Sequence, residues 1–101
     1  MKITFSVSGG LAGLMKVAVL DTATLDEAQR GEVEALVARS RIAETSERSL
    51  RSSAGRDLRT YEITVEDAQG AHTWSFDDAT VPSEAAGLLG WLRRRSRPSR
   101  P

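Results

Sequence analysis

The sequence predicts an α+β domain, built as a four-stranded antiparallel sheet with two helices on one face. Four short stretches alternate apolar and polar side chains, which is the period of a strand with one buried face. Two longer stretches carry apolar side chains three and four residues apart, which is the period of a helix. The stretches follow one another in ββαββα order, so two hairpins can merge into one sheet and both helices can cover the same face.

The first two strands are expected over residues 2–7 and 15–20. In the first, Ile3, Phe5 and Val7 alternate with polar side chains. The second contains two interleaved sets of side chains, which are Met15, Val17 and Val19 on one face and Lys16, Ala18 and Leu20 on the other. Leu20 makes this strand apolar on both faces near its end. The two strands are close enough in the chain to pair as a hairpin with a long loop.

The first helix is predicted from Leu25 to Arg39. Thr24 and Glu27 have the spacing of a capping box, in which each side chain satisfies a backbone N–H at the start of a helix. The apolar stripe of this helix comprises Leu25, Ala28, Val33, Leu36 and Val37, with Glu32 as its one polar member. We expect residues 40–57, which are rich in serine and arginine, to form a long surface connection.

The second hairpin and the last helix follow the same logic. Tyr61, Ile63 and Val65 alternate with polar residues, and Asp67–Gly70 has the composition of a hairpin turn. The fourth strand then carries His72, Trp74 and Phe76 on one face. A helix is expected to begin near Pro82, and its apolar stripe comprises Ala85, Leu88, Leu89 and Leu92.

Length and charge indicate one domain with a basic tail. A chain of 101 residues is long enough for one core. Residues 1–95 are therefore expected to form a single domain, and residues 96–101 a disordered tail. The net charge is zero, yet the last nine residues hold five of the fourteen basic side chains, so the body carries nine basic against fourteen acidic groups.

Membrane and disulfide chemistry are not expected. No apolar run approaches the roughly 20 residues of a membrane-spanning helix, and the chain opens with a strand pattern instead of the apolar core of a secretory signal. Cysteine is absent, which excludes disulfides and thiolate metal sites. We expect a monomeric, cytoplasmic protein that needs no cofactor.

Catalytic motifs are equally scarce. The single histidine, His72, shares its strand face with Trp74 and Phe76, which favours a structural role over a functional one. One histidine without cysteine makes a structural zinc site improbable. The glycines of residues 9–13 lead into a strand and lack the G-K-[ST] ending of a phosphate-binding loop. No serine stands in a G-x-S-x-G elbow, and the chain is not expected to be an enzyme.

The loop of the first hairpin is the most distinctive segment of the sequence. It comprises Ser8, Gly9, Gly10, Leu11, Ala12, Gly13 and Leu14. Glycine suits a chain reversal because it adopts positive φ at no steric cost. A bulky leucine is not needed at the tip of a turn. Leu11 either folds back onto the core or forms an apolar projection that enters a pocket of another protein.

The arginines offer an alternative function. Arg93, Arg94, Arg95, Arg97 and Arg100 could contact the phosphates of a nucleic acid or another acidic partner. The body of the protein is acidic, however, and its few aromatic residues are expected in the core instead of on a surface that stacks bases. Nucleic-acid binding is therefore the second of the two functions.

Several of these segments together resemble the emfourin family. They are Ser8-Gly9-Gly10-Leu11-Ala12-Gly13 after a strand, then Tyr61–Asp67 with Gly70 and His72, and a helix led by Pro82 that ends Trp91-Leu92-Arg93-Arg94. The likeness runs from about Ile3 to Arg95, and its most specific parts are the two hairpins taken together. The chain has Leu11 where family members often carry an aromatic residue, so a large apolar side chain is kept.

The resemblance implies an inhibitor. Emfourins are small bacterial proteins that inhibit thermolysin-like zinc metalloproteases such as protealysin. Enzymes of that type cleave on the N-terminal side of a bulky apolar residue, and Gly10–Leu11 looks like such a bond. We therefore expect residues Ser8–Leu14 to bind the active-site cleft of the protease, with Leu11 in its primed-side pocket.

Overall fold

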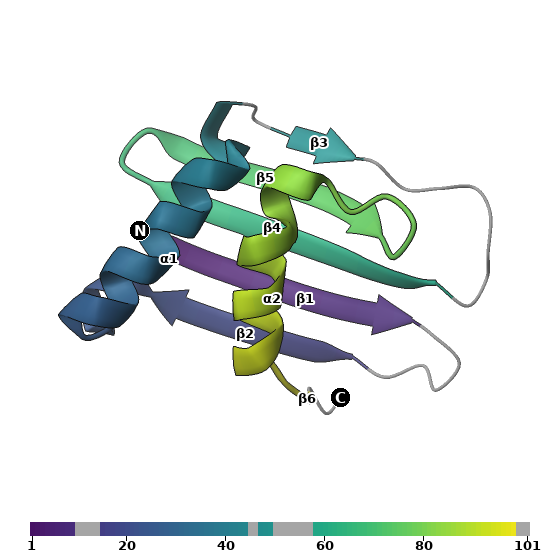
Figure 1. The fold of residues 1–101 in the computed structure, drawn as a ribbon, viewed down its shortest axis with the longest axis horizontal. Coiled ribbons are helices and arrows are strands. Elements are labelled where there is room, and N and C mark those ends of the chain that lie inside the picture. The colour runs from purple at the N-terminus through teal and green to yellow at the C-terminus, as the bar shows by residue number, and fades with distance from the viewer. Residues whose placement is uncertain (10–14, 45–46, 50–57, 99–101) are drawn as a thin grey trace.

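The computed structural model describes residues 1–9, 15–44, 47–49 and 58–98, and it has the predicted architecture. Four long strands form the centre of an antiparallel sheet, and they are β1 (Lys2–Gly9), β2 (Lys16–Asp21), β4 (Arg59–Asp67) and β5 (Gly70–Asp77). Helices α1 (Glu27–Ser40) and α2 (Ala86–Arg95) lie across one face of this sheet (Figure 1). The α+β class and the ββαββα order of the long elements are confirmed.

Short strands extend both edges of the sheet, whose order is β3-β5-β4-β1-β2-β6. Strand β3 (Glu47–Ser49) runs parallel to β5, and β6 (Arg97–Pro98) pairs with Lys16 and Val17 of β2. The interpretation of residues 40–57 as a surface connection is therefore wrong in part. Its described residues include β3 and a 3-10 helix at Ile42–Glu44, and Ile42 is 1% exposed within the core. Strand β6 lies at the start of the predicted tail, whose disorder stays a prediction.

Strand β1 is one of the two middle strands of the sheet, and it pairs with β2 on one side and with β4 on the other. The side chains of Ile3, Phe5 and Val7 point toward the helices and are buried. The rings of Phe5, Tyr61 and Phe76 follow one another across three strands, with centroids 6.4 and 5.7 Å apart. Aromatic contacts of this kind add to the area burial that holds a core together.

Strand β2 buries the opposite face from the one that its apolar pattern favours. Its pairing with β1 places Ala18 opposite Phe5 and Leu20 opposite Ile3, so these two side chains face the helices. Met15 and Val19 point to the open face and are 47% and 61% exposed. The register with the central strand therefore determines the orientation of β2, since a shift of one residue would move every side chain to the other face.

Helix α1 begins later than predicted. The side chain of Asp26 caps it by accepting a hydrogen bond of 2.7 Å from the N–H of Gln29. The hydroxyl of Thr24 instead donates to the carbonyl of Asp21 at 2.7 Å, so the predicted capping box does not form. Gly87 of α2 faces α1, because a Cβ there would come within 2.9 Å of Leu36, and the glycine lets the two helices pack closely.

Candidate functional site

The predicted binding loop leaves the sheet at the end of β1. Ser8 and Gly9 are the two predicted site residues that the structure describes, and they are the last residues of β1. Gly10, Leu11, Ala12, Gly13 and Leu14 lie outside the described residues. The two alternatives for Leu11, a place in the core or an exposed position at the tip, are therefore both untested, and the site must be built from the stem of the loop.

Gly9 is the last described residue of β1 before the loop, and its pairing with β4 sets its position. It lies opposite Arg59, and this is the last pair of the register between β1 and β4. Its φ of +92° belongs to the region that favours glycine, and a Cβ at this position would lie 3.2 Å from the carbonyl oxygen of Leu58. A side chain is thus disfavoured both by the backbone and by the neighbouring strand.

The start of β4, which borders Gly9, is held by Asp78. One carboxylate oxygen of Asp78 accepts a hydrogen bond of 2.9 Å from the N–H of Arg59, and the other accepts a short one from the hydroxyl of Tyr61. The N–H of Asp78 in turn donates to the carbonyl of Arg59 at 3.2 Å. We call this arrangement of Asp78, Arg59 and Tyr61 the carboxylate clasp.

The turn that presents Asp78 is itself well ordered by hydrogen bonds. The buried carboxylate of Asp77 accepts from the N–H of Ala79 at 2.9 Å and from the hydroxyl of Thr80 at 3.0 Å. The N–H of Asp77 donates back to that hydroxyl oxygen at 3.0 Å. The two adjacent aspartates therefore have different roles, since Asp77 builds the turn and Asp78 bonds to β4.

The electrostatics of the clasp keep Asp78 ionised. Burial opposes ionisation of its carboxyl, but the hydrogen bonds from Tyr61 and from the backbone of Arg59, with the charges of Arg59 and Arg93, outweigh that effect and hold its pKa below 3.8. Burial and the hydrogen bond to Asp78 raise the pKa of Tyr61 above 10.0. The guanidinium of Arg93 lies 5.7 Å from the centre of the Tyr61 ring. At neutral pH both carboxylate oxygens are thus free of a proton and can accept hydrogen bonds.

The comparison with known protein families gives one family over most of the chain. The model of the family described as Emfourin matches residues 5–93, which is most of the chain. The chain belongs to the emfourin family. Emfourins inhibit M4 metalloproteases and are not enzymes, so this emfourin belongs to a family of protease inhibitors. Comparisons with curated proteins and with solved structures each gave no match.

No group of three or more potential metal ligands occurs among the described residues. His72 lies on the helix-facing side of β5, as predicted, opposite Val65 and in phase with Trp74. None of the helices in the described part of the chain is long and apolar enough to cross a membrane.

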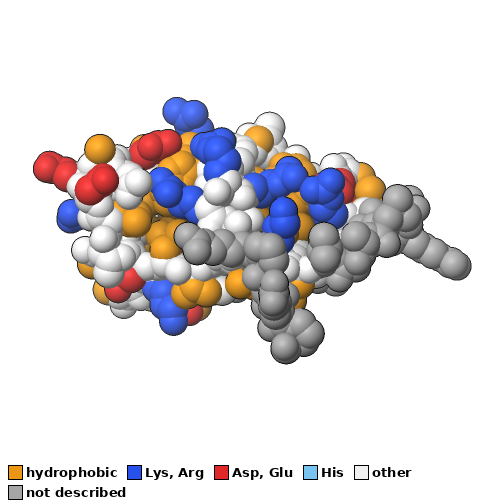
Figure 2. All heavy atoms as spheres, turned by 90° about the horizontal axis from the view of Figure 1, so that it is seen from below, with side chains coloured by type: hydrophobic (Ala, Val, Ile, Leu, Met, Phe, Trp, Pro, Cys, Tyr) orange, Lys and Arg blue, Asp and Glu red, His pale blue; other side chains and the backbone are white. Residues whose placement is uncertain are grey.

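The arginines form a second polar surface at the end of α2. Arg93, Arg94 and Arg95 occupy the last turn of this helix and are exposed. The guanidinium of Arg95 lies over the ring of Trp91 at 4.1 Å, and a hollow of about 170 Å³ is lined by Glu32, Trp91, Arg94 and Arg95. Basic side chains gather on this edge of the molecule (Figure 2).

Sequence reasoning singled out the loop, whose role stays a prediction, and missed the clasp. Asp78 follows a predicted strand, and its partners Arg59 and Tyr61 are 19 and 17 residues away in the chain. No local pattern reports such a contact. The available signal was the pair of adjacent aspartates, of which only one is needed to terminate a strand.

Proposed function

We propose that this emfourin inhibits a thermolysin-like, protealysin-type zinc metalloprotease by inserting the loop between β1 and β2 into its active-site cleft. Residues Gly9–Gly13 would lie along the cleft as a substrate does, and Leu11 would fill the primed-side pocket. The observation that carries the proposal is the stem of this loop. Its first residues end β1, a middle strand of the sheet, and Gly9 has its backbone fixed against β4.

The same frame explains how a substrate-like loop can inhibit instead of being consumed. Because β1 and β2 hold the ends of the loop, less conformational entropy is lost on binding than for a free peptide. The restraint also keeps the carbonyl of Gly10 away from the geometry of attack, or it holds the two ends together after cleavage. Either outcome leaves the cleft occupied.

Replacement of Leu11 by aspartate tests the proposal. Leu11→Asp places a charge in an apolar pocket, and the inhibition constant should rise more than tenfold against a thermolysin-like protease, a loss of at least about 1.4 kcal/mol. The matched control is Ala68→Asp, which adds the same charge to the exposed turn at the opposite end of the sheet. This control should leave the inhibition constant within twofold.

Two results would contradict all or part of the proposal, and a third measurement checks the fold. An unchanged inhibition constant for Leu11→Asp would exclude insertion of Leu11, although the protein would remain an inhibitor through another surface. A wild-type protein that fails to inhibit several thermolysin-like proteases would exclude the whole proposal. Circular dichroism of both variants confirms that the fold is kept.

A further inference from the structure

We propose that Asp78 is a positioning residue for the loop between β1 and β2, because it holds the start of β4 against the loop's first stem residue. The inference rests on the proposed function, since it assumes that this loop binds the protease. It adds a residue that lies outside the loop and more than sixty positions away from it in the chain.

The first step is the end of the ladder between β1 and β4. Gly9 and Arg59 form its last pair, so one strand continues into the binding loop and the other begins there. Terminal pairs of a sheet open more readily than internal ones, since they have neighbours on one side only. The direction in which the loop leaves the sheet therefore depends on what holds Arg59 in place.

The second step is that Asp78 supplies this hold through both backbone groups of Arg59. Its carboxylate accepts from the N–H at 2.9 Å, and its own N–H donates to the carbonyl at 3.2 Å. The pairing of β4 with β5 ends at Thr60 and Asp77, so the clasp extends the bonded sheet by one residue. Without Asp78, the N–H of Arg59 would be exposed to solvent and would form its hydrogen bond with water.

The third step connects Arg59 to the loop. The backbone next to Arg59 forms the wall against which Gly9 packs, because the carbonyl oxygen of Leu58 lies 3.2 Å from the position of a Cβ on Gly9. If β4 frays at Leu58 and Arg59, this wall is lost and Gly9 can adopt other orientations. The protease would then select one orientation from many, which weakens binding.

The clasp needs two acceptor oxygens, and only a carboxylate offers both. One oxygen serves Arg59 and the other serves Tyr61, whose ring packs in the core between Phe5 and Phe76. The hydroxyl of Tyr61 therefore ties the clasp to the aromatic core of the sheet. Asp78→Asn keeps the size of the side chain but has a single acceptor oxygen, so if this oxygen serves Arg59, the hydroxyl of Tyr61 must accept from the amide group instead of donating to a carboxylate, which is a weaker hydrogen bond.

The test compares Asp78 with an aspartate that does a similar task at the other end of the sheet. The carboxylate of Asp67 accepts a hydrogen bond of 2.8 Å from the N–H of Gln69 in the turn between β4 and β5. Asp78→Ala, Asp78→Asn and the control Asp67→Ala are each measured for thermal stability and for the inhibition constant. Amide hydrogen exchange of residues 9–13 is followed in the free protein.

We expect Asp78→Ala to raise the inhibition constant about five- to tenfold and to speed exchange at residues 9–13, with Asp78→Asn showing a smaller change in the same direction. Asp67→Ala should lower thermal stability while it leaves both loop readouts within twofold. The effect of Asp78→Ala should shrink in a Leu11→Ala background, because a residue that acts through the loop loses its influence when the loop no longer binds.

Several outcomes would overturn the proposal. Unchanged exchange at residues 9–13 in Asp78→Ala would show that the clasp does not restrain the loop. Faster exchange with an unchanged inhibition constant would show that the restraint is irrelevant to binding. Equal weakening by Asp67→Ala would assign the effect to global stability. Failure of the loop hypothesis is read separately, from Leu11→Asp in the wild-type background.

Discussion

The two hairpins of the central sheet are closed in different ways. Six residues separate Gly9 of β1 from Lys16 of β2, whereas two separate Asp67 of β4 from Gly70 of β5. The shorter connection is a compact turn in which Asp67 accepts a hydrogen bond from the N–H of Gln69. Because the strands are antiparallel, the two connections emerge at opposite ends of the sheet (Figure 1).

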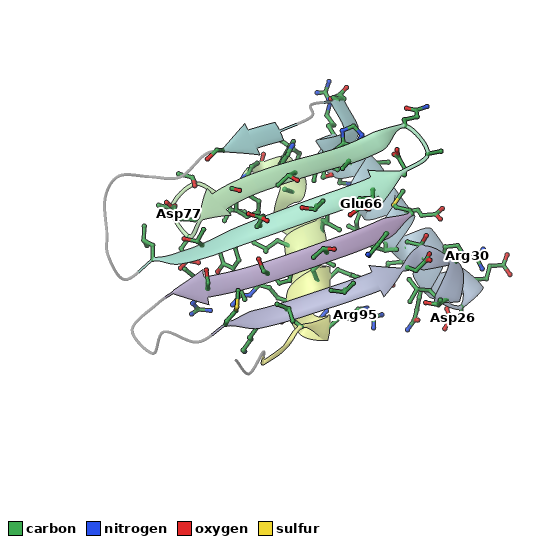
Figure 3. The ribbon with its side chains drawn as sticks, turned by 180° about the vertical axis from the view of Figure 1, so that it is seen from behind. Asp26, Arg30, Glu66, Asp77 and Arg95 are labelled. Carbon is green, nitrogen blue, oxygen red and sulfur yellow. The ribbon has the colours of Figure 1, made fainter. Side chains whose placement is uncertain are left out.

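The two hairpins also differ on the face of the sheet that points away from the helices. On β4 and β5 the hydroxyls of Thr64 and Thr73 lie 3.0 Å apart and satisfy each other across the strands. On and beside β2 the side chains of Val19 and Met15 are exposed instead. Figure 3 views this face and shows Asp77 at the loop end and Glu66 at the turn end. The open face of β4 and β5 thus pairs polar side chains across the strands, whereas the open face at β2 carries exposed apolar side chains.

The comparison is tested most strongly by replacing the connection between β1 and β2 with the one between β4 and β5. Residues 9–14 are replaced by the Asp-Ala-Gln-Gly sequence that connects β4 to β5. Inhibition of a thermolysin-like protease should weaken at least about a hundredfold, or roughly 2.8 kcal/mol, because the whole binding segment is removed. The melting temperature should fall by several degrees, because the chimaera places aspartate at position 9, where φ is positive, whereas the change in loop length contributes little.

A chimaera that still inhibits would show that the two closures are functionally equivalent and that another surface binds the protease. The control is a glycine-serine loop of the original length in place of residues 9–14, which keeps the spacing of the strands and removes the apolar side chains. It should fold and fail to inhibit.

Gly9 and Gly70, two glycines with positive φ in the described part of the chain, allow the ends of the two hairpins to be compared residue by residue. Gly9 has φ +92° and a carbonyl oxygen 3.2 Å from the position of its Cβ, whereas Gly70 has φ +132° and open space there. Gly70→Ala should cost about 1 kcal/mol of unfolding free energy from backbone strain alone. Gly9→Ala should cost about 1–2 kcal/mol, because the steric contact adds to the strain. Urea denaturation measures both.

Inhibition assays on the same two variants show which end of the sheet binds the protease. Gly9→Ala should raise the inhibition constant, since it redirects the stem of the loop, and Gly70→Ala should leave it within twofold. The reverse ranking would place the binding surface at the turn between β4 and β5.

The regions that could be predicted from the sequence are those whose side chains alone determine the structure. The alternation of Ile3, Phe5 and Val7, and that of Tyr61, Ile63 and Val65, led directly to two central strands. Strands β3 and β6 have three and two residues, which is too short for a period, and they join the sheet by pairing with β5 and β2. Helix α1 was misplaced at its start because Thr24 and Asp26 are both good caps and only the tertiary structure decides between them.

For the candidate site, glycine content and an unneeded leucine marked the loop Ser8–Leu14, whose role stays a prediction. The orientation of β2 was not readable, because Met15, Val17 and Val19 form the more apolar set and yet Ala18 and Leu20 face the core. The clasp of Asp78 depends on a long-range contact, which no local pattern encodes.

The smallest expected effect is a pH dependence of the stability, which arises from Asp78 and Tyr61 at the end of the sheet that carries the loop between β1 and β2. The pKa of Asp78 is held below its ordinary 3.8, so its ionised carboxylate stabilises the fold above about pH 4, and this contribution disappears as the pH falls through the folded-state pKa. Tyr61 has the opposite sign, because its pKa lies above 10.0, and its contribution is lost as the pH rises through that value. Asp78 is exposed, which keeps the effect modest.

Urea denaturation of the wild type and of Asp78→Asn at pH 7 and pH 3 measures the acid limb. The wild type should be the more stable at pH 7, and the difference should narrow at pH 3, where its carboxyl gains a proton. A difference that is the same at both pH values would mean that the ionisation of Asp78 contributes nothing to stability. Because aspartate and asparagine have the same size, the remaining difference would then come from the hydrogen bonds that the two side chains form, and the clasp would hold the start of β4 without any contribution from charge.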